Sequence, residues 1–550
     1  MEKRYFLALL LAAAVVALTQ VLFPVAKPAS PSDVKRDTTS SITTAVPRAQ
    51  RAVPSVAKEP RRLVEDSVST ADIQAEVTTL ETERSVYEFS NIGAAPVSIQ
   101  LKGYKNLAPS GGLVELRVPG QPLLKYDLVI KGDTVSLDRV PFSLSRSESS
   151  TGSEQLSFAA IVNNVHVTIA YSPVPNRYLV RINGQIEGAP DGTYLLMQLP
   201  STLRPAESDT VADLNNLAYS FKPQRDNARI VQFSKLDPGE EELQAGPLIW
   251  AAVKNKYFVF GLLNLPGSSF NEVTLKGGPR TSKIATTATA TIVKAVQGGA
   301  FTMDLYAGPQ QSTELIAAGR DFDHVNPYGW QFLQGVVQPI AALCIRLLLW
   351  MHQVLQLSYG WVLVIFGVLV RIVLWPLNQS AMRSSMKMQE IQPRLAEVQK
   401  KYKDKPERQR EEIMKVYKET GASPFTALTG CLPALIPMPV LFALFFVFQN
   451  TIEFRGVPFM WLFDISMKDP YYILPILMGI SMYALSWIGL RNAPPNPQAK
   501  MMSYMFPVMM TFVLANMASG LNLYYTAQNL AAIPQQWLLA RERARRKRVT

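Results

Sequence analysis

The sequence at residues 360–377 reads GWVLVIFGVLVRIVLWPL, an apolar run with a single charged side chain, Arg371. About 20 apolar residues suffice for a helix to cross the hydrocarbon core of a bilayer, so this run predicts a membrane-spanning helix. A charge near the centre of such a helix is unfavourable by about 2.5–3.5 kcal/mol and usually faces the protein interior or a wet cavity. Alternatively, the Arg371 side chain could extend to the nearby membrane surface.

Further apolar runs on both sides of this segment predict several membrane spans. We expect them at residues 5–23, 359–377, 424–448, 470–488, 503–518 and 521–540. Only Ser519-Gly520 joins the last two, which predicts that these two helices pack together as a pair. Six spans place both termini on the same side of the membrane.

The distribution of basic residues predicts which side that is. Segment 383–420 has 11 Lys/Arg against 7 Asp/Glu, and the tail 541–550 has 6 Lys/Arg against 1 Glu. The predicted outer loop 450–469 has only Arg455 and Lys468. Because basic loops stay in the cytoplasm, both termini are predicted to be cytoplasmic. This pattern explains the net charge of +12 better than a nucleic-acid-binding surface does.

Residues 1–23 are predicted to form an N-terminal transmembrane anchor, because Lys3 and Arg4 precede a long apolar run. A cleaved signal peptide is the alternative, although such peptides have a shorter apolar core and a small-residue cleavage site. Residues 24–72 are rich in Pro, Ser, Thr, Ala and basic residues. They lack an apolar period and are predicted to be a flexible periplasmic linker.

Short segments of alternating apolar and polar residues fill residues 73–325. Examples are Val97–Leu101, Val165–Ile169 and Tyr178–Ile182. With turn residues between such segments, the pattern predicts an extracytoplasmic antiparallel β-sandwich domain. A short helix is expected at Ser312–Ala318. The chain's two cysteines, Cys344 and Cys431, lie in apolar segments outside this domain, so no disulfide framework is expected there.

Residues 326–358 combine apolar character with polar interruptions. Arg346, His352 and several Gln residues interrupt the apolar run, and Trp330 and Trp350 are residues that favour membrane interfaces. We therefore predict an amphipathic interfacial helix on the outer membrane surface. A short membrane-spanning helix is the alternative.

Residues 383–420 are predicted to form an antiparallel helical hairpin in the cytoplasm. Its first helix has apolar residues at heptad spacing, at Met388, Ile391, Leu395, Val398 and Tyr402. Asp404-Lys405-Pro406 interrupts the pattern, and a second apolar face follows at Ile413, Met414 and Tyr417. Such a hairpin could bind a partner or serve only as a solvated connector.

The sequence contains no signature of catalysis. It has no P-loop, dinucleotide fingerprint or nucleophile elbow. Its three histidines, His166, His324 and His352, are widely separated, so no metal site is expected. His166 lies on an alternating strand and is expected to be a structural or surface residue. The sequence therefore predicts neither an enzyme nor a cofactor-binding protein.

Several motifs resemble the YidC family of bacterial membrane insertases, which has relatives in mitochondria and chloroplasts. They are Tyr328-Gly329-Trp330, Gly430-Cys431-Leu432-Pro433, the run from Asp469 to Gly479, and Ser519-Gly520-Leu521 followed by Tyr524-Tyr525. The resemblance covers the whole chain. It implies an inner-membrane location, a five-helix insertase core at residues 359–540, and a periplasmic β-sandwich that is dispensable for core activity.

The resemblance also implies a mechanism. The core would enclose a hydrophilic groove, open to the cytoplasm and to lipid, that inserts newly made membrane proteins and helps them to fold, alone or with the Sec translocon. Arg371 matches the groove arginine of the family. Leu441, Met482 and Tyr525 match positions at which nascent chains contact the groove.

Two positions depart from the family pattern, and further partners are implied. Pro437 stands where relatives often have Gln, and Val513 stands where an aromatic residue is common. The polarity of the groove could therefore differ in this chain. The family also implies ribosome binding, for which the cytoplasmic hairpin and the basic tail 541–550 are the candidate surfaces.

Two other classes of protein compete with this interpretation. A secondary transporter should show paired repeats and broken helices, and the sequence has no internal repeat. A periplasmic sugar-binding module is compatible with a β-sandwich, but no aromatic cluster identifies a sugar site.

Overall fold

The structure is a computed structural model. The chain forms two compact units, a larger one of Pro60–Val373 with Val440–Thr550 and a smaller one of Leu374–Pro439 with residues 1–59. The predicted anchor 1–23, the linker 24–72, Cys431 and Pro437 lie outside the described residues. The described residues are 75–148, 152–280, 284–326, 328–329, 333–376, 378–379, 391, 394–395, 397–402, 405–419, 438–490 and 497–546.

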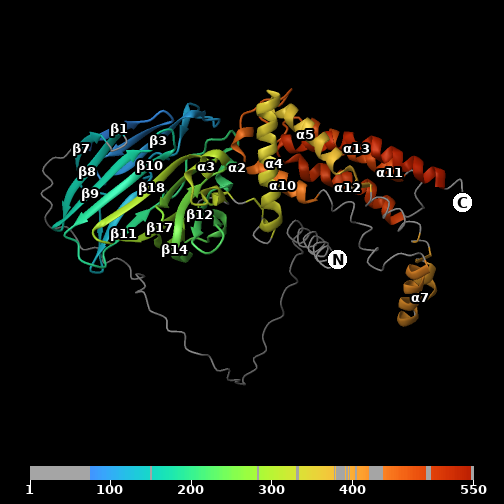
Figure 1. Ribbon diagram of the computed structural model, residues 1–550, viewed down its shortest axis with the longest axis horizontal. Coiled ribbons are helices and arrows are strands. Elements are labelled where there is room, and N and C mark those ends of the chain that lie inside the picture. Colours follow the sequence, from blue (N-terminus) through green and yellow to red (C-terminus); the bar gives the residue numbers. More distant parts are fainter. Residues whose placement is uncertain are drawn as a thin grey trace, which may run out of the picture. The chain divides into compact units, whose positions relative to one another are not determined.

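The N-terminal half of the larger unit contains two antiparallel β-sheets (Figure 1). The smaller sheet has the order β1-β2-β3-β4, with β1 at Val77–Glu81, β2 at Ser85–Ser90, β3 at Ala95–Lys105 and β4 at Leu113–Glu115. The larger sheet has 14 strands, 12 of them in the order β6-β5-β11-β17-β16-β14-β15-β18-β10-β9-β8-β7, while β12 pairs with β14 and with β13.

The strands of the larger sheet have these bounds: β5 Lys125–Ile130, β6 Asp133–Ser136, β7 Ser143–Glu148, β8 Glu154–Val162, β9 Val165–Pro173, β10 Leu179–Glu187, β11 Tyr194–Gln198, β12 Ala218–Pro223, β13 Arg229–Gln232, β14 Glu241–Lys254, β15 Phe258–Asn264, β16 Phe270–Gly277, β17 Ala288–Ala295 and β18 Ala300–Pro309. Short helical segments are α2 (Thr210–Asn215), η1 (Phe233–Lys235), α3 (Ser312–Ala318) and η2 (Phe322–Val325).

Side-chain alternation accounts for the sandwich. Along β17 every second residue is buried, because successive side chains in a strand point to opposite faces. The inward-facing side chains form one hydrophobic core that includes Trp250, Tyr87 and Phe158. The three quoted alternating segments lie in β3, β9 and β10, although β10 begins at Leu179 rather than Tyr178, and α3 has the predicted bounds.

The C-terminal half of the larger unit is helical. Its helices are α4 (Gln334–Leu355), α5 (Tyr359–Val373), α10 (Met438–Asn450), α11 (Ile473–Leu490), α12 (Pro497–Ala515) and α13 (Ser519–Arg546), with a 3₁₀ turn, η3 (Ile452–Phe454), after α10. Among the described residues, α4 from Gly335 to Leu355 and α11 are long and apolar enough to cross a membrane. One face of α4 is buried at Val337, Ala341, Cys344, Leu348 and Met351.

The predicted pairing of the last two helices is wrong. Residues 516–518 join α12 to α13, yet these two helices scarcely contact each other, and α11 packs closely against both of them. Gly479 of α11 allows the close approach to α12, because a Cβ at this position would lie 2.1 Å from Thr511 Oγ1. Tyr483 of α11 also stacks on Tyr504 of α12 at 5.4 Å between ring centroids. Side-chain fit therefore separates two helices that a short turn joins.

In the smaller unit, α7 (Pro406–Glu419) begins at the predicted break. Ile391 and Leu395 form a buried cluster with Tyr417 of α7, and Ile413 and Val416 pack against it. The predicted apolar contact between two helical segments is thus present. Met414 does not take part, since 46% of its surface is exposed.

Candidate functional site

Buried polar side chains lie along α13 inside an otherwise apolar helical bundle. Asn522, Thr526, Gln528 and Gln535 are all less than 9% exposed. With about 100° between successive residues, Asn522 and Thr526 lie on one side of α13 and Gln528 and Gln535 lie on another. Buried polar groups need hydrogen-bond partners, and in a membrane the neighbouring helices must supply most of them. These side chains are therefore expected to fix the positions of the helices on two sides of α13.

Two contacts show how these side chains connect the helices. The Asn529 side-chain amide donates to Ser481 Oγ of α11 at 3.0 Å. The Asn522 amide donates to the carbonyl oxygen of Leu514, near the end of α12, at 3.0 Å. Helix α13 is thus bonded through polar side chains to α11 and, at the connecting turn, to the end of α12.

Arg371 forms the corresponding contact between α5 and α13. Its Nη2 donates to Gln535 Oε1 at 2.7 Å, while its Nε is buried and has no hydrogen-bond partner. The side chain is half-buried and lies in the last turn of α5. Arg371 is thus directed toward a neighbouring helix, which supports the interior position over simple extension to the membrane surface.

Close backbone approach makes this contact possible. A Cβ at Gly367, one turn before Arg371, would lie 2.9 Å from the Tyr524 carbonyl oxygen and 3.3 Å from Ala527 Cβ. On the same side, Phe366 packs against the Tyr524 ring at 5.9 Å between centroids. Only a glycine lets the two backbones approach this closely without displacement, and Arg371 then reaches Gln535.

The other three predicted groove residues lie on three different helices. Met482 is on α11 and Tyr525 on α13, which pack against each other, and both side chains are half-buried. Leu441 is half-buried near the start of α10. The hydrogen bond of Arg371 goes to Gln535, a residue that sequence reasoning missed because 164 positions separate the two.

Comparison with known proteins adds to this geometry. Two family models match the chain, "60Kd inner membrane protein" over residues 350–547 and "YidC periplasmic domain" over residues 77–343. Together they cover both the helical part and the β-sandwich.

Curated relatives match over similar lengths. Membrane protein insertase YidC of Chlorobaculum tepidum is 30% identical over 417 residues, covering 71% of this chain and 68% of that protein. The insertase of Chlorobium phaeovibrioides is 30% identical over 511 residues, covering 86% and 84%. That of Syntrophus aciditrophicus is 27% identical over 570 residues, covering 98% and 100%. A crystal structure of an active YidC insertase matches at a TM-score of 0.33 and 17% identity, covering 87% of this chain and 95% of that one.

These matches define an inner-membrane protein with a periplasmic β-sandwich domain and a helical C-terminal core. The chain belongs to the YidC family of membrane protein insertases. It is therefore a membrane protein insertase and not an enzyme, and its substrates are newly made membrane proteins in contact with lipid. The family predicted from the sequence motifs is confirmed, and the transporter alternative is not supported.

Proposed function

We propose that α5, α10, α11, α12 and α13 enclose a hydrophilic groove, open to the cytoplasm and to lipid, through which clients enter the membrane. The observation that carries this proposal is the half-buried Arg371, hydrogen-bonded to the buried Gln535 of α13. A wet groove with one cation shortens the apolar path that a polar client segment must cross. It also attracts client carboxylates, because charges interact more strongly where the dielectric constant is low.

The groove need not supply energy. A client's apolar helix gains about 25 cal/mol per Å² of apolar surface when it leaves water for lipid. Leu441, Met482 and Tyr525 would contact the client during this transfer, with apolar or amphipathic side chains that tolerate varied sequences. Insertion then follows from a lowered barrier rather than from nucleotide hydrolysis or proton chemistry.

We further propose six membrane spans, with both termini in the cytoplasm and the segment boundaries predicted from the sequence. The basic segments 383–420 and 541–550 support this orientation. Helix α4 runs across the direction that α5, α11 and α13 share in Figure 1. This direction and its single buried face support an interfacial position for α4 rather than a further span.

Two partners are also proposed. Among the described residues of 383–420, basic side chains are exposed next to the apolar cluster, at Arg394, Lys400, Lys401, Lys405, Arg408, Arg410, Lys415 and Lys418. These cations and those of the basic tail are suited to bind ribosomal RNA. The Sec translocon is proposed as the partner for clients that the groove does not insert alone.

Substitution of Arg371 tests the groove. We expect Arg371→Ala to slow insertion of clients with acidic extracytoplasmic tails in reconstituted vesicles, and the loss to grow with tail charge. We expect Arg371→Lys to retain much of the activity, because the charge remains although the planar guanidinium is lost.

A client with a neutral tail serves as the control for folding and membrane assembly of the variant. It should insert at nearly the wild-type rate. Equal rates for Arg371→Ala and wild type across all tail charges would show that Arg371 has no role in the groove.

A further inference from the structure

Part of the loop between α10 and α11 is buried in the β-sandwich. Ile452, in the 3₁₀ turn η3, is only 4% exposed and belongs to the same hydrophobic core as the sandwich strands. Gly456 lies close to Leu107 of the sandwich, with 3.8 Å from Leu107 Cδ1 to a Cβ placed at this glycine. The outer loop of the membrane core is thus partly built into the periplasmic domain.

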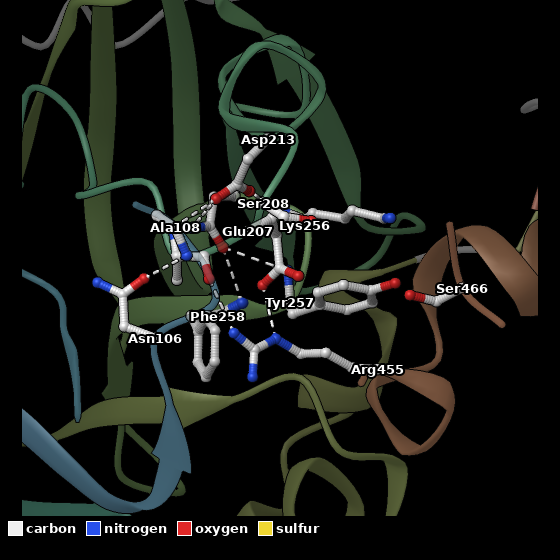
Figure 2. A network of polar contacts seen from close by, with 12 residues as sticks. Asn106, Ala108, Glu207, Ser208, Asp213, Lys256, Tyr257, Phe258, Arg455 and Ser466 are labelled. Atoms are coloured by element: carbon white, nitrogen blue, oxygen red, sulfur yellow. Dashed lines mark hydrogen bonds and ion pairs between the residues drawn. The ribbon is translucent and has the colours of Figure 1, made fainter. Parts of the chain in front are cut away.

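Arg455 is the centre of this junction (Figure 2). Its Nε donates to Glu207 Oε1 at 2.6 Å and its Nη2 donates to the carbonyl oxygen of Ala206 at 2.8 Å. The guanidinium also lies over the Phe258 ring, 5.4 Å from its centroid. The side chains of Arg455 and Glu207 are only 6% and 3% exposed, so the ion pair is shielded from solvent and weakly screened by salt.

The sandwich holds its side of the junction in a fixed shape. Asp213 of α2 is 1% exposed and accepts hydrogen bonds from the backbone N–H of Ala206 at 2.9 Å and of Lys256 at 3.1 Å. The Asn255 amide donates to the same carboxylate at 3.3 Å. Asp213 therefore fixes the backbone at Ala206, whose carbonyl oxygen receives Arg455 and which directly precedes Glu207. Figure 2 shows Asp213, Glu207 and Arg455 together.

The same loop also holds the outer ends of the helices. Phe454 stacks on Phe448 of α10 at 4.9 Å between ring centroids and meets Tyr359 of α5 edge-on at 5.3 Å. Further along the loop, the carbonyl oxygens of Met467 and Ile465 accept hydrogen bonds from the first two residues of α13 at 2.7 and 2.8 Å. One loop thus contacts α5, α10 and α13 on one side and the sandwich on the other.

We infer that Arg455 is the positioning residue of a clasp by which the periplasmic domain holds the outer ends of the core helices. The clasp consists of Arg455, Glu207, Ala206, Asp213 and Phe258. The clasp concerns how the domain is docked on the core and not the insertion step, because the family resemblance implies a sandwich that is dispensable for core activity. Reversing the charge of Arg455 would place two carboxylates in one buried site, which strongly disfavours the docked arrangement.

Cross-linking tests whether the clasp holds in the membrane. Ser208 Oγ of the domain lies 3.9 Å from Met467 Sδ of the loop. The pair Ser208→Cys and Met467→Cys, in a chain with Cys344→Ala and Cys431→Ala, should be joined in native membranes by a short cross-linker with two thiol-reactive ends. Arg455→Glu should reduce the cross-linking yield at least about tenfold, because like charges would then meet in a buried site.

Charge exchange separates the ion pair from general packing. Arg455→Glu combined with Glu207→Arg should recover much of the cross-linking yield, while Arg455→Lys should give an intermediate yield. Arg229→Glu is the matched control, because Arg229 also pairs with a glutamate, Glu242, and lies over a phenylalanine ring, but on an exposed surface. It should leave the cross-linking yield unchanged.

The outcomes separate the clasp from the groove. Unchanged cross-linking in Arg455→Glu would overturn the clasp, and so would failure of the charge exchange to recover the yield. Loss of the groove mechanism would instead appear as normal insertion by Arg371→Ala with the clasp cross-link still forming.

Discussion

Glu207 shows how burial changes the pKa of a single carboxylate. Its side chain is almost completely buried, and burial raises its pKa from 4.5 to about 7, although Arg455 acts to lower it. One carboxylate oxygen, Oε2, has no hydrogen-bond partner, which makes the charged form harder to stabilise. Its ion-pair partner is 248 residues away in the sequence, so no local pattern could have predicted this pair.

The raised pKa of Glu207 predicts a pH dependence of stability. The folded chain binds this proton more tightly than the unfolded chain. The contribution of protonated Glu207 to the free energy of unfolding is therefore fully present below pH 4.5 and is lost as pH rises toward about 7. The full effect is about 3 kcal/mol. Thermal unfolding of wild type and of Glu207→Gln between pH 4.5 and 8 should show wild type losing stability relative to the variant as pH rises.

The comparison with Glu207→Gln isolates this one group. Arg455 faces Glu207 from the outer loop, Asp213 faces it from α2, and Lys256 faces it from the turn after β14, and all three are present in both proteins. Their own titrations therefore largely cancel in the difference. A difference that stays constant across this pH range would contradict the raised pKa.

The sequence singled out Arg371 as a candidate but not its hydrogen-bond partner, Gln535. One charge in an apolar run is a strong signal, because its burial is so unfavourable. Gln535 lies in a helix that also contains Asn522 and Asn529, so its polarity alone did not distinguish it. Only the packing of α5 against α13 selects it.

At the scale of helices, the contact between α5 and α13 depends on Gly367. A leucine at this position would favour helix formation but would collide with the α13 backbone, separating the two helices. We expect Gly367→Leu to break the bond between Arg371 and Gln535 and to destabilise the core by about 1–3 kcal/mol. Insertion of clients with acidic tails should fall as it does in Arg371→Ala.

Gly489→Leu in α11 is the control for this substitution. A Cβ at Gly489 would lie 3.7 Å from Gln536 Oε1, which is an ordinary contact. This variant should insert the same clients at a rate close to wild type. Equal activity of both leucine variants would mean that the close approach at Gly367 does not position Arg371.

The positions of helices and strands in the sequence were easier to predict than which of these elements pack beside one another. Alternation located β3, β9 and β10, because the period reflects one buried face. The order of strands depends on pairings between distant segments, as in β14, which pairs with β12, β15 and β16. The prediction that α12 and α13 pack as a pair was wrong for the same reason. A short turn limits the distance between the ends of two helices, but the fit of their side chains determines which helices pack together.

At the scale of the whole molecule, composition separated a mixed polar part from an apolar part, and this division agrees with the sandwich and the helical bundle. Composition did not predict the contact between the sandwich and the helical bundle. Arg455 was noted only as one of two basic residues in an outer loop, whereas the structure gives it a buried partner in the sandwich. Long-range contacts of this kind decide whether two folded parts act together.

Topology is the prediction that belongs to this scale. Cytoplasmic retention of basic segments orients the helices, and the two most basic segments, 383–420 and 541–550, are both predicted inside. A reporter active only outside the cytoplasm should work when inserted at the exposed turn Asp191-Gly192 and fail when fused after Thr550. A reporter active only in the cytoplasm should give the opposite result and serves as the control for expression.

Replacing the six basic residues of the tail with Gln should weaken this orientation, because these charges help to hold the last helix end inside. Activity of the outside reporter at the C-terminus of the unaltered chain would rule out six spans with both ends in the cytoplasm, whatever the groove does.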